Sequence, residues 1–169
     1  MTGPRRDASS DRLADLYDRF AGALFRYAAI LLADRMAAAD AVHQVFLRLT
    51  KLVATRGDES TVGESYLRRA VRNECYSLLR SRRREGVVAV DAKLLELVEG
   101  FDERPAERLV LEEALRELPP EQREVIHLKV WEGMTFQEIA DMAGESINTA
   151  ASRYRYAIEK LRAILTEKN

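Results

Sequence analysis

The chain has 169 residues, enough for one ordinary domain or two small ones. Hydrophobic residues make up 47% and charged residues 33%, a composition that buries a core beneath a heavily charged surface and excludes a disordered chain. The net charge is -1, so no global basic excess indicates nucleic acid, and the longest apolar stretch, residues 27–33, is far shorter than the roughly 20 residues of a membrane span. The only cysteine, Cys75, excludes an internal disulfide framework. We therefore expect a cytoplasmic protein without membrane insertion.

The first part of the chain predicts three helices. Residues 1–10 are polar, and we expect a flexible terminus there. Apolar residues then recur every three or four positions over residues 13–31, 42–52 and 66–79, which is typical of helices with one buried face. These helices predict a first domain over residues 11–85.

Charge is distributed very unevenly on either side of residue 85. Residues 66–84 hold seven arginines and one acid, whereas residues 86–118 hold four bases and nine acids. A basic helix thus meets an acidic segment. Residues 86–105 lack a clear period, and we expect a linker there.

A second helical domain is predicted over residues 106–169. Its first helix is ended by Pro119 and Pro120, because a residue before proline avoids helical backbone angles. Pro120 also suits the first turn of the next helix, which runs to about Trp131. The fold predicted is all-α, with two small helical domains joined by an acidic linker.

The end of the chain has the spacing of a helix-turn-helix. Thr135 and Glu138 form a capping box, Gly144 suits a left-handed turn, and Ser146 can cap the following helix. That helix has an apolar stripe and a polar face that can reach a major groove. The polar face consists of Asn148, Thr149, Ser152, Arg153, Arg155 and Tyr156. A plain helical hairpin with a solvated face is the alternative, but the three signals together favour DNA binding.

The basic helix of the first domain is a second candidate for nucleic acid. Its arginines suit phosphate, and its aromatic and amide side chains suit unstacked bases. The candidate residues are Tyr66, Arg69, Arg72, Asn73 and Ser77. A solvated helix whose terminal arginines interact with the helix dipole explains this segment equally well, so both interpretations stay open here.

Several segments resemble the extracytoplasmic-function (ECF) sigma factors. The second domain matches the family's sigma-four domain through LPPEQREVI at residues 118–126 and EGMTFQEIA at residues 132–140. The first domain looks like a sigma-two domain through DAVHQVFLR at residues 40–48 and YLRRAVRN at residues 66–73. The resemblance implies that sigma-two docks on the clamp of RNA polymerase core and opens the minus-ten element of promoter DNA. It also implies that sigma-four reads the minus-thirty-five element as duplex.

Carried over by position, the resemblance implies a clamp-binding set on the second predicted helix. The set consists of Asp40, His43, Gln44 and Arg48. Many members of the family are held inactive by an anti-sigma factor, so the resemblance implies a partner of that kind as well. Gln44 and Tyr66 depart from the glutamate and tryptophan that are usual in the family.

No catalytic constellation is evident, so we expect a protein that is not an enzyme. Two separated histidines and one cysteine make no metal site, and no cofactor is expected. An alternative is a helix-turn-helix regulator that acts without polymerase, which needs only the second domain. A third hypothesis is an interaction protein that keeps the fold and titrates a regulator.

The charge pattern also suggests how the free protein behaves. We expect weak promoter binding by the free chain, because its acidic linker can compete with DNA for the arginines. Core polymerase would then separate the domains and place both on one promoter.

Overall fold

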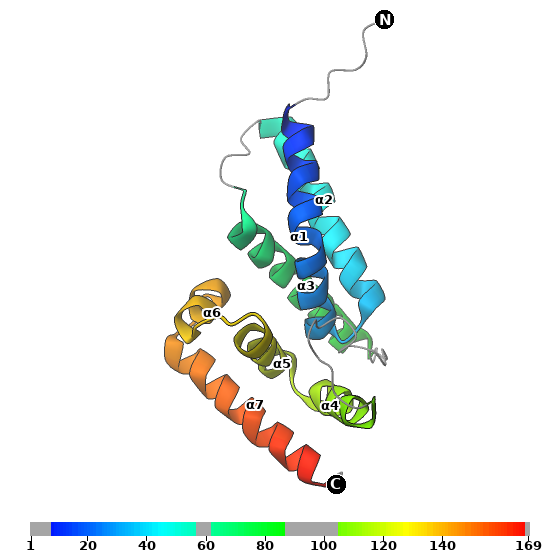
Figure 1. The fold of residues 1–169 in the computed structure, drawn as a ribbon. Coiled ribbons are helices and arrows are strands. Elements are labelled where there is room, and N and C mark those ends of the chain that lie inside the picture. Colours follow the sequence, from blue (N-terminus) through cyan, green and yellow to red (C-terminus); the bar gives the residue numbers. More distant parts are fainter. Residues whose placement is uncertain (1–7, 57–61, 87–104, 168–169) are drawn as a thin grey trace, which may run out of the picture.

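The computed structural model describes residues 8–56, 62–86 and 105–167 (Figure 1). Within these ranges the chain forms helices joined by short turns and contains no strand, which confirms the all-α prediction. None of the described helices is both long and apolar enough to cross a membrane. We call the described residues up to 86 the first half and residues 105–167 the second half.

The first half consists of three helices, α1 (Ala8–Leu32), α2 (Arg35–Arg56) and α3 (Glu64–Glu85). The first two run side by side as an antiparallel hairpin, and α3 crosses them (Figure 1). In the tight turn between α1 and α2, the carboxylate of Asp34 accepts the backbone N–H of Ala37 at 3.0 Å. α1 begins at Ala8, so it extends into the segment that was predicted to be a flexible terminus.

The second half contains α4 (Pro105–Glu117), α5 (Pro120–Ile126), α6 (Phe136–Ala143) and α7 (Ile147–Glu167). A π-helical segment, η2 (His127–Trp131), continues directly from α5. The helix predicted from Pro120 to about Trp131 is therefore confirmed in extent, although its last residues have π-helical hydrogen bonds. α4, α5 and α7 share a core of their own around Leu115, Leu118 and Ile126.

The helix-turn-helix spacing is confirmed in detail. The hydroxyl of Thr135 accepts the N–H of Glu138, whose carboxylate in turn accepts the N–H of Thr135 at 2.7 Å. Gly144 ends α6 in the left-handed conformation at φ 68°, which favours glycine. The hydroxyl of Ser146 accepts the N–H of Thr149 at 3.1 Å and caps α7. Each cap depends on neighbouring residues only, which is why the sequence alone could predict it.

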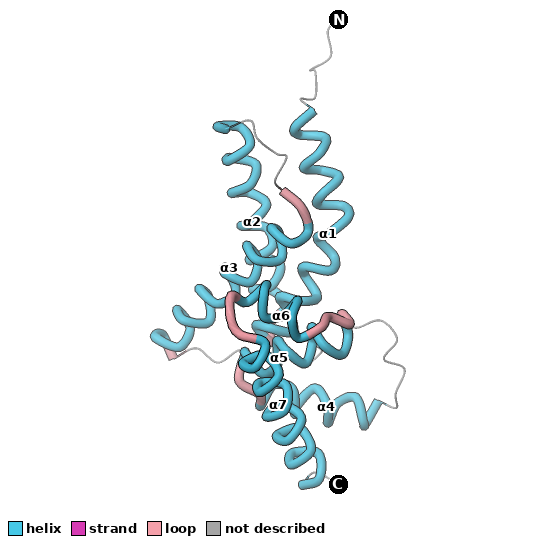
Figure 2. Tube along the Cα trace, turned by 90° about the vertical axis from the view of Figure 1, so that its left-hand side faces the viewer, coloured by secondary structure: helices cyan, strands magenta, loops and turns pink. Residues whose placement is uncertain are grey.

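The two halves pack against each other through a continuous apolar core. Val125 and Leu128 of the second half belong to the same buried cluster as Leu31 and Val71 of the first half. Figure 2 shows α5 and α6 lying against the first half, with α4 and α7 further out. The two predicted helical units therefore form one packed body in this structure.

Some expectations from the apolar pattern are wrong or lie outside the described residues. Leu109 and Ile147 belong to the apolar residues that recur along their helices, but they are 52% and 45% exposed. Each lies in the first turns of its helix. Residues 87–104 of the predicted linker are not described.

Replacing Leu128 tests the shared core. Leu128 is fully buried at the junction of the halves, so Leu128→Ala should lower the free energy of unfolding by about 2–5 kcal/mol. The matched control, Leu109→Ala, removes the same atoms from an exposed site and should change it by less than about 0.5 kcal/mol. Urea unfolding followed by circular dichroism measures both. Equal effects of the two substitutions would contradict the placement of Leu128.

Candidate nucleic-acid interface

The outer face of α3 lines an open cavity of ≈ 560 Å³ between α3 and α2. Tyr66, Asn73 and Ser77, three of the predicted DNA-binding residues, all line it. Tyr66 is 42% exposed, and Asn73 and Ser77 are also exposed. An aromatic ring beside an amide and a hydroxyl can stack on an unstacked base and hydrogen-bond to its edge. The outer face therefore has the side chains that single-stranded nucleic acid requires.

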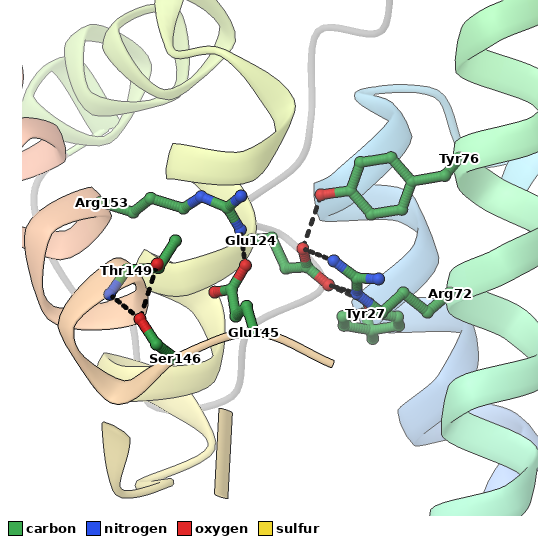
Figure 3. A network of polar contacts seen from close by, with 8 residues as sticks. All are labelled: Tyr27, Arg72, Tyr76, Glu124, Glu145, Ser146, Thr149 and Arg153. Atoms are coloured by element: carbon green, nitrogen blue, oxygen red, sulfur yellow. Dashed lines mark hydrogen bonds and ion pairs between the residues drawn. The ribbon is translucent and has the colours of Figure 1, made fainter. Parts of the chain in front are cut away.

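The inner face of α3 is covered by the second half. The carboxylate of Glu124 on α5 is 4% exposed and accepts hydrogen bonds from three side chains of the first half (Figure 3). The hydroxyl of Tyr27 donates at 2.5 Å and that of Tyr76 at 2.6 Å. The guanidinium of Arg72 donates through Nε at 2.8 Å and through Nη2 at 3.2 Å. We call these four residues the Glu124 cluster.

The electrostatics of the Glu124 cluster keep its donors protonated. Burial raises the pKa of Tyr27 and of Tyr76, and the charge of Glu124 raises both further. Burial by itself would lower the pKa of Arg72, but the attraction of Glu124 outweighs it and raises that pKa above its ordinary value. The carboxylate is thus satisfied by one charged and two neutral donors, as a buried charge requires.

A second ion pair joins α3 to η2 and the turn after it. The guanidinium of Arg68 donates to Glu132 at 2.8 Å and to Glu64 at 3.2 Å. Glu132 also lies 3.1 Å from Nε2 of His127. Burial opposes ionisation of Glu132, but the hydrogen bonds from His127 and Arg68 outweigh it and lower its pKa to about 2. The guanidinium of Arg69 also contacts the second half, because it donates a hydrogen bond to the backbone carbonyl of Asp141 at 3.1 Å.

The predicted DNA-binding residues of α3 are thus divided between two faces. Tyr66, Asn73 and Ser77 face the outer cavity, whereas Arg69 and Arg72 contact the second half. Glu124 and Glu132, the partners of this helix, are not predicted by the sequence pattern. The sequence does indicate that Glu124 needs a partner. It lies four residues before Leu128 and so on the same buried helix face, where a charge must be paired.

The recognition-helix candidates on α7 also differ in accessibility. Asn148, Arg155 and Tyr156 are exposed, and Ser152 is half-buried. Thr149 is half-buried, and its hydroxyl lies 2.8 Å from that of Ser146. Arg153 forms an ion pair with Glu145 in the turn before α7, and Figure 3 shows it alongside the Ser146 cap. Arg153 therefore stabilises the turn in this state. Arg155 is more accessible to DNA than Arg153.

The clamp-binding candidates on α2 share one solvent-facing surface. Asp40, His43 and Gln44 are exposed, as is Arg48, which forms an ion pair with Glu74 of α3. Their spacing of three and four residues explains the shared face. Leu47 lies within the same face and is 41% exposed, which adds an apolar contact point.

Comparisons with known proteins identify both halves. Residues 16–85 match the Sigma-70 region 2 family model, and residues 114–163 match the Sigma-70, region 4 model. A chain with both regions is a sigma factor of the sigma-70 class. Because region 2 is matched as well, the alternative of a regulator that needs only a helix-turn-helix is not supported.

Individual relatives narrow the class. The "ECF RNA polymerase sigma factor SigL" of Mycobacterium tuberculosis is 33% identical over 155 residues, covering 90% of this chain and 88% of the relative. The "RNA polymerase sigma-E factor" of Streptomyces avermitilis is 32% identical over 152 residues, covering 85% of this chain and 83% of the relative. The chain belongs to the ECF sigma factors.

A solved structure has a similar fold. It is the sigma factor RpoE of Bartonella quintana in complex with the anti-sigma factor NepR, with a TM-score of 0.69 and 24% identity. The match covers 92% of this chain and 97% of that chain. The fold therefore extends across both halves.

Acid should weaken the contacts of Glu132 in a defined pH range. The pKa of Glu132 falls from an ordinary value of 4.5 to about 2 in the folded chain. Its stabilising contribution is therefore complete above pH 4.5 and is lost as the pH falls toward 2. The difference in unfolding free energy between the wild type and Glu132→Gln should shrink across that range, as measured by urea unfolding at successive pH values.

Glu167→Gln, at the exposed end of α7, is the control. Its difference from the wild type should stay small and change little with pH. The free energies of unfolding of the wild type and Glu132→Gln could instead differ equally at both ends of the pH range. That result would contradict the assignment of the lowered pKa to Glu132.

Proposed function

We propose that this chain binds RNA polymerase core and directs it to particular promoters, where it promotes opening of the DNA. The observation that carries this proposal is the cavity that unites Tyr66, Asn73 and Ser77 beside the exposed face of α2. Bases that unstack from the minus-ten element would enter this cavity, and binding them repays the few kcal/mol that unstacking costs. The chain would act in the cytoplasm and without enzymatic activity of its own, since polymerisation belongs to the partner.

The exposed face of α2 is the proposed contact with the polymerase clamp. It presents Asp40, His43, Gln44 and Arg48 around the exposed side chain of Leu47. Mixed charges around an apolar centre are typical of a protein interface with a polar rim. This face adjoins the outer cavity, because Arg48 belongs to both. Docking on the clamp would therefore place the cavity next to the DNA strand that polymerase separates.

The N-terminal half of α7 is the proposed reader of the minus-thirty-five element. Its exposed side chains, Asn148, Arg155 and Tyr156, combine amide, guanidinium and phenol groups that can contact base edges and phosphates. In a helix-turn-helix the first residues of the second helix enter the major groove. Thr149 and Ser152 would flank these contacts, and Arg153 would join them on release from Glu145.

The packed arrangement is the proposed resting state of the free protein. Arg72 cannot contact phosphate while Glu124 holds it, and Arg69 is engaged by the second half as well. The competing carboxylates seen here are Glu124 and Glu132 of the second half, whereas the acidic linker invoked from the sequence lies mostly outside the described residues. Core polymerase would separate the halves, and an anti-sigma factor of the kind bound to the similar structure would keep them together.

Releasing Arg72 should open the protein. Glu124→Gln keeps the size of the side chain but removes the charge that Arg72 pairs with, and loss of one partner from a buried pair costs about 3–5 kcal/mol. We expect a larger radius of gyration in small-angle X-ray scattering. We also expect tighter binding of the free chain to single-stranded minus-ten DNA, with a steeper salt dependence because more phosphates are contacted.

The matched control is Glu159→Gln on the exposed surface of α7, which should leave the radius of gyration unchanged. Circular dichroism establishes that both variants remain helical. A helical Glu124→Gln chain that is as compact as the wild type, with the same salt dependence, would refute the resting-state proposal.

Promoter recognition can be tested with a pair of arginines on one face of α7. With core polymerase, the wild-type chain should give run-off transcripts from a subset of a promoter library. Arg155→Ala should weaken binding to the minus-thirty-five element by about 1–3 kcal/mol and relax the base preference. Arg162, seven residues further along α7, is the control, and Arg162→Ala should have little effect. The absence of any wild-type transcript above core enzyme alone would overturn the proposed function.

A further inference from the structure

A cavity of ≈ 340 Å³ lies between the end of α3 and the turn from α4 to α5, at the boundary of the two halves. Five arginines line it together with a single acid, Glu121, among the described residues. Three of the arginines come from α3 and two from the second half. They are Arg80, Arg82, Arg83, Arg116 and Arg123. Positive charge thus converges on one cavity from both halves.

The guanidinium of Arg123 is the most buried of these groups. Arg123 is 5% exposed, and its Nη2 donates to the backbone carbonyl of Leu31 at 2.7 Å. Its Nη1 contacts only backbone carbonyls, at 3.4 Å, and its Nε has no partner in the described part of the chain. Burial lowers the pKa of Arg123 to about 10, because no carboxylate in the described ranges is bonded to it to offset the loss of water. A buried cation held by neutral groups favours an anion close by.

Further donors lining the cavity also lack partners among the described residues. These are Nε and Nη2 of Arg116 and Nη1 of Arg82, all of which are buried. Arg82 is partly neutralised, since its Nη2 donates to Asp34 at 2.6 Å. Buried polar groups in folded proteins are nearly always hydrogen-bonded, so several unpaired donors around one cavity indicate a ligand rich in acceptors.

The rest of the lining is mainly apolar. It includes Leu32, Leu79, Leu118, Pro120 and Tyr76. A cavity of this size is at the lower end of the range for small-molecule sites, which commonly run from about 300 to 1,000 Å³. It is too small for a partner's helix, which is about 10–12 Å across with its side chains. The lining therefore suits a small molecule with an anionic end and an apolar end.

We propose that this cavity binds a small phosphorylated molecule of about mononucleotide size. Guanidinium groups that approach from different helices can donate to the several oxygens of a phosphate, and arginine is the preferred side chain for that contact. The apolar side chains of the lining would hold the base or another apolar part. Because donors from both halves are needed, such a ligand binds the packed arrangement better than an opened one and shifts the equilibrium toward it. This regulatory consequence rests on the proposed function, whereas the binding itself does not.

Isothermal titration calorimetry on the purified full chain tests the binding. The probes are adenosine monophosphate, inorganic phosphate, adenosine, a short oligodeoxythymidine and a glutamate-rich peptide. We expect saturable binding of adenosine monophosphate, weaker binding of phosphate and none of adenosine. Arg116→Ala should weaken binding of adenosine monophosphate by about tenfold or more, a loss typical of one charge-assisted contact. Two of its side-chain donors, Nε and Nη2, have no partner in the described protein, so the variant should fold normally.

Arg12→Ala, on the exposed surface of α1, is the matched control and should bind like the wild type. The proposal is overturned if neither phosphate nor adenosine monophosphate binds, or if Arg116→Ala binds as well as the wild type. It is equally overturned if only the oligonucleotide or only the acidic peptide binds, since the arginines would then serve DNA or a protein partner. The titration needs no polymerase, so its outcome is independent of the transcription assay.

Discussion

The way in which the two halves of this sigma factor dock is set by one buried carboxylate. Glu124 lies in the apolar interface between the halves, where an unpaired charge would be very costly, and all three of its side-chain donors come from the first half. The cluster is therefore satisfied only when the halves are together. Separation exposes Glu124 and Arg72 to water, which solvates both well, so the polar part of the contact adds little net stability. Its main effect is to define one docking position.

This arrangement gives α3 two faces that differ in how accessible they are to nucleic acid. The outer face, with Tyr66, Asn73 and Ser77, stays open in the packed state, whereas Arg68 and Arg72 form ion pairs with carboxylates of the second half. Packing thus weakens the sequence-independent attraction of α3 to phosphate. It leaves the side chains that can contact bases accessible.

Features that depend on nearby residues could be predicted from the sequence. The periodic apolar residues predicted the helices, and the capping box at Thr135, the turn at Gly144 and the cap at Ser146 follow from spacings of a few residues. The shared faces of α2 and α7 follow in the same way, because positions three or four apart lie together on any helix. The resemblance to ECF sigma factors rested on the same local motifs, and the matches to regions 2 and 4 confirm it.

Contacts between distant parts of the chain were decided only by the tertiary structure. Glu124 is separated from Tyr27 by 97 positions and from Arg72 by 52, and nothing in the sequence shows which charges will meet across such separations. The exposure of Leu109, the bracing of Arg153 and the convergence of five arginines on one cavity likewise depend on which helices pack together. The sequence alone determined the helices, their caps and the family. Packing decided which basic side chains are free, since their partners are chosen by three-dimensional proximity and by the cost of burying a charge unpaired.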